Sequence, residues 1–322
     1  MIIHSTVAYA DFCQAHAAAL PVFFQPWWLD AVGQHGAWQK YVIRDDHGQA
    51  IGIWPVFTKR RYGFHWHTLP PCTPISGPWF AEHHHLTPLL LSAFASQIAA
   101  GHLYWLLQSM HSVAQATSWR ENGFEVDLRH TYRLPPTNDP DELFRRFRTT
   151  TRNEIRKADR TLQIRPVDDL RHFLPLYRQH AREKGIFVSA LVPVLEAIYA
   201  ACLERGQGQL LCAYDAQENL HAGVFLVWDQ QVTYVLIISR NQNFPTSAAT
   251  RLLLWRAIQH SVVAGRIFDF NGGDVPSIGN FFAAFGAQKT AYLRATIYPN
   301  PLVRFAVKLA KHIRHPRGHL FR

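Results

Sequence analysis

The spacing of apolar residues along the first half of the chain predicts alternating helices and strands. Two apolar stretches within residues 38–61 meet at Asp45-Asp46-His47-Gly48, a turn signal that predicts a β-hairpin. Leu134–Glu142 is rich in proline and polar residues, which predicts a linker after this half. The other elements expected before the linker are a loop and helix over 21–34, a helix over 86–100, a strand over 103–109, a helix over 112–122 and a strand over 124–134.

The second half repeats this order of elements, with helices that again precede short apolar strands. Its predicted elements are a helix over 144–160, a strand over 162–167, helices over 169–184 and 193–204, strands over 209–215, 221–229 and 231–239, a helix over 246–264, a strand over 267–270, a helix over 277–285 and a strand over 290–298. The repetition predicts an α/β (α+β) protein made of two tandem units, each a mixed, mainly antiparallel sheet flanked by helices. We place the units at residues 1–140 and 141–300, followed by a tail over 301–322.

The composition is that of a globular protein with a large core, since 48% of the 322 residues are hydrophobic and 17% are charged. The most apolar window, residues 186–203, contains Pro193 and Glu196, which favours a buried helix over a membrane span. The first residues lack the positive and apolar regions of a secretory signal, so we expect a cytoplasmic protein. The four cysteines form no CxxC pair, which fits a reducing compartment.

The net charge of +10 comes from two basic segments. Residues 143–165 hold eight Lys/Arg against two acids, and residues 301–322 hold six Lys/Arg and no acid, so each segment contributes +6. The rest of the chain therefore carries a net charge of −2. Local basic patches of this kind favour contact with anionic substrates, nucleic acid or membrane surfaces.

The first basic segment is predicted to form one helix over Phe144–Arg160, with a buried seam beside its charges. The seam consists of Phe144, Phe147, Thr151, Ile155, Ala158 and Leu162. Arg148, Arg152, Arg156 and Arg160 step by four next to the seam, and like charges at this spacing repel one another. Guanidinium groups hold phosphate bidentately, so an anion bound against the stripe would offset the repulsion. A solvated basic face is the alternative.

Motifs of other enzyme classes are weak or absent. No GxSxG or GxxxxGK[ST] motif occurs, and Gly206-Gln207-Gly208 lacks the third glycine of a dinucleotide site. His65-Trp66-His67 and Glu82-His83-His84-His85 could supply metal ligands, but a defined site also needs a third ligand and supporting partners. Because nineteen histidines make chance clusters common, we expect no bound metal.

The tail begins with a basic amphipathic pattern. Its predicted helix has Val303, Val307, Ala310 and Ile313 near one side and Arg304, Lys308, Lys311 and Arg314 on the other. Such a helix can lie on an anionic membrane or against RNA. It can equally pack on the body of the protein with its charges in water.

Four segments of the second half occur in an order that resembles a known family. They are Arg152-Asn-Glu-Ile155-Arg156-Lys157-Ala158, LLLWRAIQHSVVAG from Leu252, FDFNGG from Phe268 and FFAAFGAQ from Phe281. This order resembles the FemAB-like branch of the GNAT acyltransferase superfamily, over residues 140–298 and more loosely over the first half. The resemblance implies two tandem GNAT-like domains, no bound cofactor, an acyl-CoA or aminoacyl-tRNA co-substrate and transfer to an amine.

The resemblance also implies where the substrates bind. In the superfamily the donor's pyrophosphate lies at the N-terminus of the helix after the fourth strand, which corresponds here to residues 240–249. Ala248 and Ala249 stand there in place of glycines, and an altered loop of this kind is compatible with aminoacyl-tRNA, the donor of Fem-type enzymes. The candidates for catalysis are Asp269, Asn271, Asp274 and Tyr234, and those for binding are Arg148, Arg152, Arg156, Lys157, Gly272, Gly273, Ser239, Arg240, Ser247 and Ala248.

The turn Asn271-Gly272-Gly273-Asp274 is the expected wall of the acceptor site. It follows the strand 267–270, and open α/β folds keep their ligand crevice at strand ends. Two glycines let backbone amides approach a substrate with no side chain in the way. Alternation along the strand places Asp269 on the face opposite its phenylalanine neighbours, toward the core. A tight turn with no other role is the alternative.

The sequence thus predicts an N-acyltransferase or aminoacyltransferase that acts on an amino group of a cell-envelope precursor or similar small molecule. Transfer RNA is an expected partner, and the basic tail predicts peripheral contact with the inner face of a membrane. The alternative is a non-catalytic GNAT-like binding module that docks on RNA or an anionic membrane surface. Nucleic-acid binding that weakens steeply with salt, without turnover, would favour this alternative.

Overall fold

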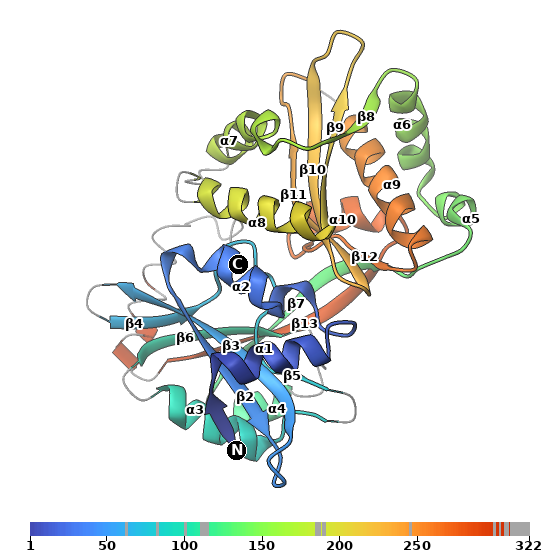
Figure 1. Cartoon of the computed structure of the whole chain (residues 1–322). Coiled ribbons are helices and arrows are strands. Elements are labelled where there is room, and N and C mark those ends of the chain that lie inside the picture. The colour runs from blue at the N-terminus through green and yellow to red at the C-terminus, as the bar shows by residue number, and fades with distance from the viewer. Residues whose placement is uncertain are drawn as a thin grey trace. The chain divides into compact units, whose positions relative to one another are not determined.

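The computed structural model describes residues 1–61, 64–81, 84–99, 102–109, 116–183, 188, 191–244, 247–298, 301–302, 304–305 and 309. The chain divides into two compact units (Figure 1). The first comprises Met1–Arg129 with Ala291–Arg322, and the second comprises His130–Thr290. The strands β7 (Glu125–Leu134) and β13 (Gln288–Ile297) each contribute residues to both units.

The first unit contains one sheet with helices packed against it. Its elements in chain order, besides β7 and β13, are β1 (Ile2–His4), α1 (Thr6–Ala15), the 3-10 turn η1 (Val22–Phe24), α2 (Pro26–Val32), η2 (Gly33–His35), β2 (Ala37–Arg44), β3 (Ala50–Arg61), β4 (Phe64–Thr68), β5 (Trp79–Phe80), α3 (Pro88–Ala99), β6 (His102–Ser109) and α4 (Ala116–Glu121). The strands follow the order β1-β2-β3-β4-β6-β13, with β5 beside β3. Only β4 and β6 in this series are parallel among the described pairings.

The hairpin predicted within residues 38–61 is confirmed, because β2 and β3 pair antiparallel from Ala37 to Arg44. The core of this unit is aromatic. Trp54 stacks on Phe94 of α3 at 3.5 Å between ring centroids, and Trp119 of α4 packs edge-on against Phe124. Gly123 ends α4 with a positive φ of 82°, as its position in the sequence predicted.

The second unit is a three-layer arrangement of helix, sheet and helix. Its elements are α5 (Pro140–Arg145), α6 (Thr149–Asp159), β8 (Gln163–Val167), η4 (Leu170–His172), α7 (Leu174–Glu183), α8 (Val192–Arg205), β9 (Gly208–Tyr214), β10 (Leu220–Trp228), β11 (Val232–Arg240), α9 (Ala248–Val263), β12 (Ile267–Asp269) and α10 (Pro276–Ala283). The strands follow the order β7-β12-β11-β10-β9-β8, and only β11 and β12 are parallel in this described series.

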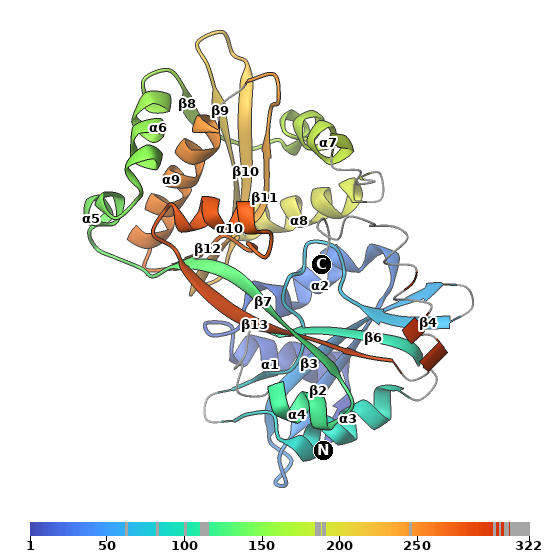
Figure 2. The ribbon, with the colours of Figure 1, turned by 180° about the vertical axis from the view of Figure 1, so that it is seen from behind.

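The two faces of this sheet are covered by different helices, as Figures 1 and 2 show from opposite sides. Alternation along β10 divides its residues between the two layers. Ala222, Val224 and Leu226 belong to the core cluster that includes α9 and the seam of α6. Phe225 instead meets Tyr199 of α8 at 5.4 Å between ring centroids. The continuous apolar run in the sequence of β10 therefore reflects burial on both faces.

The predicted single helix over Phe144–Arg160 is wrong, because the structure breaks it into α5 and α6. Arg148 adopts an extended backbone as the N-cap of α6, and its amide donates to the Ala284 carbonyl at 2.9 Å. The break lets Phe147 turn inward against Phe285 and Trp255. The predicted seam nevertheless holds, since Phe147, Thr151, Ile155 and Ala158 are all buried.

The predicted fold class is confirmed, since both units have mainly antiparallel sheets flanked by helices. The compact units differ from the boundaries predicted from the sequence. Residues 291–297 belong with the first unit because β13 pairs with β6, where Leu293 lies opposite Ser109. His130–Leu134 belong with the second unit because β7 pairs with β12, where Asp269 lies opposite Arg133.

Among the described residues, no helix is both long and apolar enough to cross a membrane. All four cysteines are free thiols. Burial raises the pKa of Cys13, Cys72 and Cys202 to about 12, so these thiols stay protonated at neutral pH. Cys13 and Cys202 belong to the buried core.

Candidate functional site

The two parallel strands of the second unit pair over only three residues and then separate. Val232–Tyr234 of β11 lie opposite Ile267–Asp269 of β12. Beyond this pairing a side chain connects the turn to β11, because Asn271 Nδ2 donates to the Val235 carbonyl at 3.2 Å. An extra residue on β11, between Val235 and Ile237, bends that strand at the same level. The predicted turn Asn271–Asp274 thus begins where the sheet opens.

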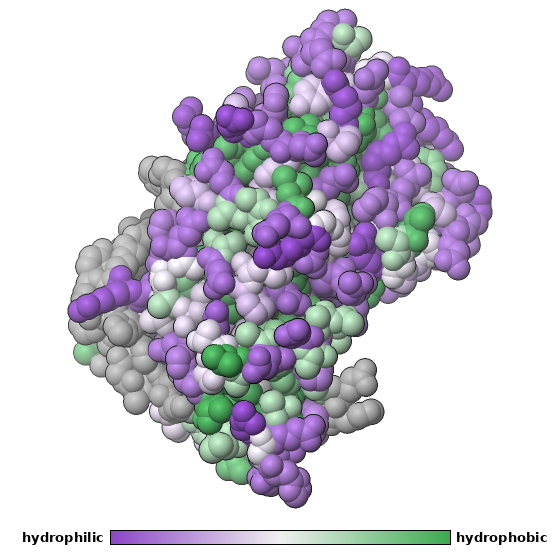
Figure 3. Space-filling model, viewed as in Figure 1, coloured by the Kyte–Doolittle hydropathy of each residue, from purple (hydrophilic) through white to green (hydrophobic). Residues whose placement is uncertain are grey.

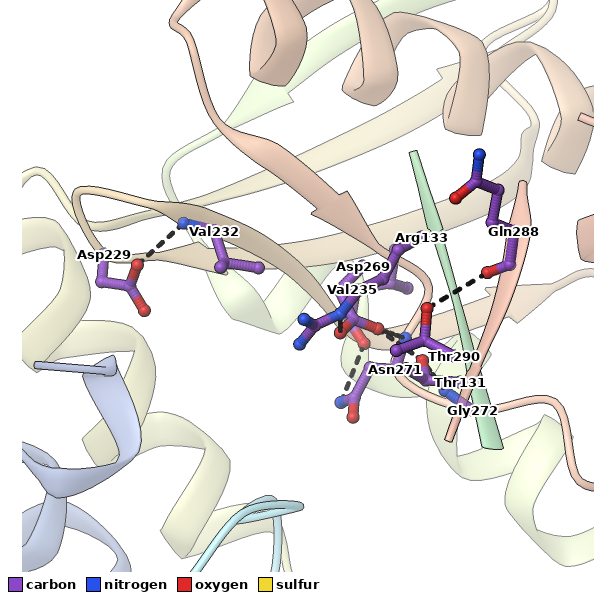
Figure 4. A network of polar contacts seen from close by, with 10 residues as sticks. All are labelled: Thr131, Arg133, Asp229, Val232, Val235, Asp269, Asn271, Gly272, Gln288 and Thr290. Atoms are coloured by element: carbon purple, nitrogen blue, oxygen red, sulfur yellow. Dashed lines mark hydrogen bonds and ion pairs between the residues drawn. The ribbon is translucent and has the colours of Figure 1, made fainter. Parts of the chain in front are cut away.

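Asp269 anchors the turn from within the core. Its carboxylate accepts hydrogen bonds from the Thr131 hydroxyl at 2.5 Å and the Asn271 amide at 2.7 Å, and Arg133 Nε lies 2.7 Å from its other oxygen. Figure 4 shows these groups converging on one carboxylate. Asp269 is buried toward the core as alternation predicted. Through these three contacts Asp269 fixes the position of the turn. Its predicted catalytic role stays a prediction.

The two glycines of the turn have different surroundings. The Gly272 amide donates to the Thr131 hydroxyl at 3.2 Å, so this predicted substrate contact is engaged by the protein itself. Gly273 has a φ of +129° and lies under the ring of Tyr132, where an added Cβ would stand 2.5 Å from Cδ2. A side chain at position 273 would therefore collide with Tyr132. The amide of Gly273 stays the predicted substrate contact.

We expect Gly273→Ala to destabilise the protein by about 2 kcal/mol, because the new methyl group overlaps the Tyr132 ring on a backbone that L-residues rarely adopt. Thermal unfolding of the full chain measures the change. Gly206→Ala is the matched control, since Gly206 also has a positive φ of 61° but nothing lies within 4 Å of its added Cβ. The control should lose about 1 kcal/mol. Equal losses in the two variants would contradict the packing of Tyr132 over the turn.

Asp274 closes the turn against a histidine that the sequence patterns did not single out. Its Oδ1 accepts a hydrogen bond from the His130 amide at 2.9 Å and lies 3.7 Å from His130 Nδ1. Both side chains are partly exposed. The two residues are 144 positions apart in the chain, so no local spacing could have paired them. An exposed imidazole beside a carboxylate is a suitable proton acceptor for an amine.

Tyr234 is fully buried beside two carboxylates. It lies opposite Asp269 in the β11–β12 pairing. Burial, followed by the negative charges of Asp229 and Asp269, raises its pKa well above the usual value. Tyr234 therefore stays neutral across the physiological pH range and is placed as a core hydroxyl. Asp229 itself accepts from the Gln231 and Val232 amides at the β10–β11 turn.

The predicted arginines form a second group on α5 and α6. Arg148, Arg156 and Lys157 are exposed, whereas the Arg152 side chain folds back to donate to the Arg145 carbonyl and to the Thr149 hydroxyl. Arg156 lies over the Phe144 ring, 5.5 Å from its centroid. Figure 3 shows hydrophilic residues covering the α5 and α6 region at the right of the view.

The start of α9, the predicted donor loop, lies against α6. Ser247 is the N-cap of α9, and its hydroxyl is 3.4 Å from Glu154 Oε2, which also binds Arg251 Nε at 2.6 Å. Ala248 and Ala249 are buried in the core behind this cluster. A carboxylate from α6 thus lies beside the first turn of α9. No role of this kind was predicted for Glu154 from the sequence.

Ser239 and Arg240 lie at the end of β11, opposite Gly223 and Ala222 of β10. Ser239 is buried and Arg240 is partly exposed. Both lie further along β11 than Val235, whose carbonyl accepts from Asn271, and therefore at the same end of the parallel β11–β12 pairing as the turn.

The helix α10 connects the two groups of predicted residues. It begins two residues after Asp274, and the Ala284 carbonyl at its C-terminal end accepts the hydrogen bond from the Arg148 amide. Its eight residues correspond to about 12 Å of helix axis. The glycine turn and the N-cap of α6 therefore lie near opposite ends of α10.

No group of three His, Cys, Asp or Glu side chains in the described parts of the chain is placed to hold a metal ion. His67 is buried and its Nδ1 is 2.7 Å from the Thr58 hydroxyl. His83 and the side chain of His65 fall outside the described residues, so the two predicted histidine clusters are seen only in part.

Comparison with known proteins relates part of this chain to a domain family and the whole chain to solved structures. Residues 145–276 match the family model of the acetyltransferase (GNAT) domain. The crystal structure of FemX is similar over 95% of this chain and 99% of its own, with a TM-score of 0.69 and 15% sequence identity. None of the curated proteins compared with this chain matches it.

Two further structures show the same fold at lower similarity. L-PGS from Bacillus licheniformis covers 91% of this chain and 92% of its own, with a TM-score of 0.53 and 11% identity. A tandem GNAT protein from the clavulanic acid biosynthesis pathway covers 83% and 85%, with a TM-score of 0.53 and 9% identity. The predicted resemblance to FemAB-like acyltransferases of the GNAT superfamily is therefore confirmed.

Proposed function

We propose that this chain, whose second unit carries the GNAT domain, transfers an acyl or aminoacyl group from an activated donor to an amine. The observation that carries the proposal is the opening between β11 and β12. The glycine turn lies at the edge of this opening, and the segment that matches the GNAT domain contains both. The candidate donors are acyl-CoA and aminoacyl-tRNA. The acceptor we propose is an amine on an anionic cell-envelope precursor, which the exposed Arg148, Arg156 and Lys157 support. The likenesses to FemX and L-PGS rest on fold alone.

The reaction requires the protein to position two substrates and to accept a proton. The amine nitrogen forms a bond to the donor's carbonyl carbon, and the bond from that carbon to the leaving oxygen or sulfur breaks. The attacking ammonium must first lose a proton, for which we propose His130, with Asp274 oriented beside its Nδ1. The Gly273 amide would polarise the carbonyl oxygen. The leaving group takes up a proton as it departs.

The arginine group supports an anionic substrate of some length. Arg148 lies at the far end of α10 from the glycine turn, a helix length of about 12 Å, and Arg156 and Lys157 lie further along α6. Both a nucleotide-linked precursor and the end of a transfer RNA exceed this length. The basic face also supports the non-catalytic alternative, RNA docking, which the same measurements would detect as binding without turnover.

The experiment is a thermal-shift screen of the full chain against acyl-CoAs, aminoacyl-tRNA and nucleotide-activated sugars, followed by a transfer assay with the ligands that bind. A ligand that binds the folded state raises the melting temperature by mass action. A ligand-dependent shift without any acyl transfer to amines would favour the binding module. No shift and no transfer with any of these donors would contradict the proposal.

We expect the double variant Arg148→Ala/Arg156→Ala to raise KM for the anionic substrate about tenfold, because charge-assisted contacts to phosphate are lost. Steady-state kinetics of transfer measures this. Arg178→Ala, an exposed arginine on α7 at the other face of the sheet, is the matched control and should leave KM unchanged. If kcat and KM of the double variant equal those of the wild type, the arginines do not hold a substrate.

A further inference from the structure

Arg133 is bound to the core through one edge of its guanidinium group. Its Nε lies 2.7 Å from Asp269 Oδ2, and Oδ1 of the same carboxylate accepts from the Thr131 hydroxyl and the Asn271 amide. Neither Nη atom of Arg133 donates a hydrogen bond to any residue in the described part of the chain. The N–H groups of both Nη atoms are therefore left for a partner outside this network.

The free end of the guanidinium group is accessible. The Arg133 side chain is 24% exposed, whereas the Asp269 side chain that holds it is 2% exposed. Figure 4 shows the two Nη atoms on the side of Asp269 that faces away from Thr131 and Gly272. A ligand can therefore contact the Nη atoms without displacing the hydrogen bonds that fix the glycine turn.

A buried carboxylate fixes the direction of this arginine. The carboxylates paired with Arg165, Arg251 and Arg256 of the same unit are 67%, 41% and 46% exposed, so those pairs are solvated and weakly oriented. Asp269 is instead held by three protein groups in the core, and it holds Arg133 in turn. Side chains that are oriented in this way by a supporting residue are typical of binding sites.

The described part of the basic tail contains no comparable group. Its one basic residue, Arg304, is paired with Glu125, at 2.6 Å between Nε and Oε1, and that glutamate is 35% exposed. The parts of the predicted tail helix that lie outside the described residues are Val303, Val307, Lys308 and everything from Ala310 onward.

The charges around Arg133 favour a ligand with a single negative charge. Asp269 already balances the positive charge of Arg133, and Asp274 adds a second carboxylate at the turn. Tyr234, opposite Asp269 on β11, stays neutral because burial raises its pKa well above the usual value. These carboxylates repel a phosphate dianion more strongly than a monoanion. A carboxylate has one charge and two oxygens at the spacing of the two Nη atoms.

We propose that the two Nη atoms of Arg133 bind a carboxylate of the amine acceptor, at a site on β7 beside the glycine turn. This inference rests on the proposed function and narrows the acceptor to amines that also carry a free carboxylate, such as amino acids and peptides. Each Nη–H donates to one carboxylate oxygen, while Nε–H keeps its contact with Asp269. Arg133 thus binds the substrate and takes no part in the bond-forming step.

The test compares two probes that differ only at the carboxylate, alanyl-alanyl-alanine and its C-terminal amide. Titration calorimetry of the full chain measures the Kd of each probe. We expect the wild type to bind the free acid about tenfold more tightly than the amide, because the amide cannot accept two charge-assisted hydrogen bonds from the guanidinium group. Equal Kd values for the two probes, or no binding of either, would overturn the proposal.

Arg133→Lys separates the shape of the guanidinium group from its charge. Lysine keeps a positive charge beside Asp269 but cannot hold a carboxylate with two parallel N–H groups, so the preference for the acid should fall to about twofold or less. Arg256→Lys is the matched control, since Arg256 is also paired with a carboxylate, that of Asp159, and it should keep the wild-type preference. An Arg133→Lys chain with the full preference would show that Arg133 serves only as the counter-ion of Asp269.

Thermal unfolding checks that Arg133→Lys is folded. The comparison of acid and amide on the wild type needs no variant, so it decides the matter even if Arg133→Lys fails to fold. Neither measurement uses acyl transfer. A wild type that prefers the acid but transfers no acyl group would contradict the proposed function alone, whereas transfer to amines without this preference would contradict only the carboxylate site.

Discussion

Asp269→Ala is expected to destabilise the chain by about 3 kcal/mol, because it removes one member of a buried ion pair and leaves the others unsatisfied. Three groups converge on this carboxylate: Arg133 Nε, the Thr131 hydroxyl and the Asn271 amide. The Arg133 side chain is 24% exposed, so water compensates part of the loss, and the estimate lies at the lower end for such pairs.

The measurement is urea unfolding of the full chain with two companion variants. Asp269→Asn keeps an oxygen to accept from Thr131 and Asn271 but loses the charge opposite Arg133, so its loss should be intermediate. Glu154→Ala is the matched control, since Glu154 also binds an arginine Nε at 2.6 Å but is 41% exposed. An exposed pair contributes about 1 kcal/mol or less. Similar losses for Asp269→Ala and Glu154→Ala would mean that Asp269 does not anchor the turn.

His130→Ala is expected to lower kcat for acyl transfer about 100-fold while changing the melting temperature little, because a positioned proton acceptor contributes at least that factor. His130 is partly exposed, so its removal leaves no buried cavity. The assay uses whichever donor and amine the screen identifies. Asp274→Asn keeps an acceptor for the His130 amide and loses the charge beside Nδ1, so its effect on kcat should be smaller.

The control for this prediction is His172→Ala, an exposed histidine of η4. It should leave kcat unchanged. A His130→Ala enzyme with wild-type kcat would show that the amine loses its proton to water or to the donor itself. The glycine turn would then contribute to the reaction only by positioning the substrates.

The local parts of the fold could be predicted from the sequence because their causes are local. The β2–β3 hairpin follows from alternating apolar residues around a turn, and the ends of α4 and α9 follow from Gly123 and Gly265. The buried direction of Asp269 also followed from strand alternation. In each case the residues that decide the structure are neighbours in the chain.

The pairings that define the candidate site could not be predicted in this way. Thr131 and Arg133 meet Asp269 across 138 and 136 positions, which only the β7–β12 pairing brings together. The break before α6 likewise depends on the distant Ala284 carbonyl. A periodic pattern reports which face of an element is buried and not what covers it. The binding and catalytic roles assigned to the predicted residues stay predictions.

The passage of β7 from one unit to the other sets where this protein can be divided. The segment that matches the GNAT family begins at residue 145, after β7 has ended. A fragment cut at that boundary would contain Asp269 and the glycine turn but would lack Thr131 and Arg133, which hold them. The segment that matches the domain family is thus shorter than the compact unit around it, which runs from His130 to Thr290.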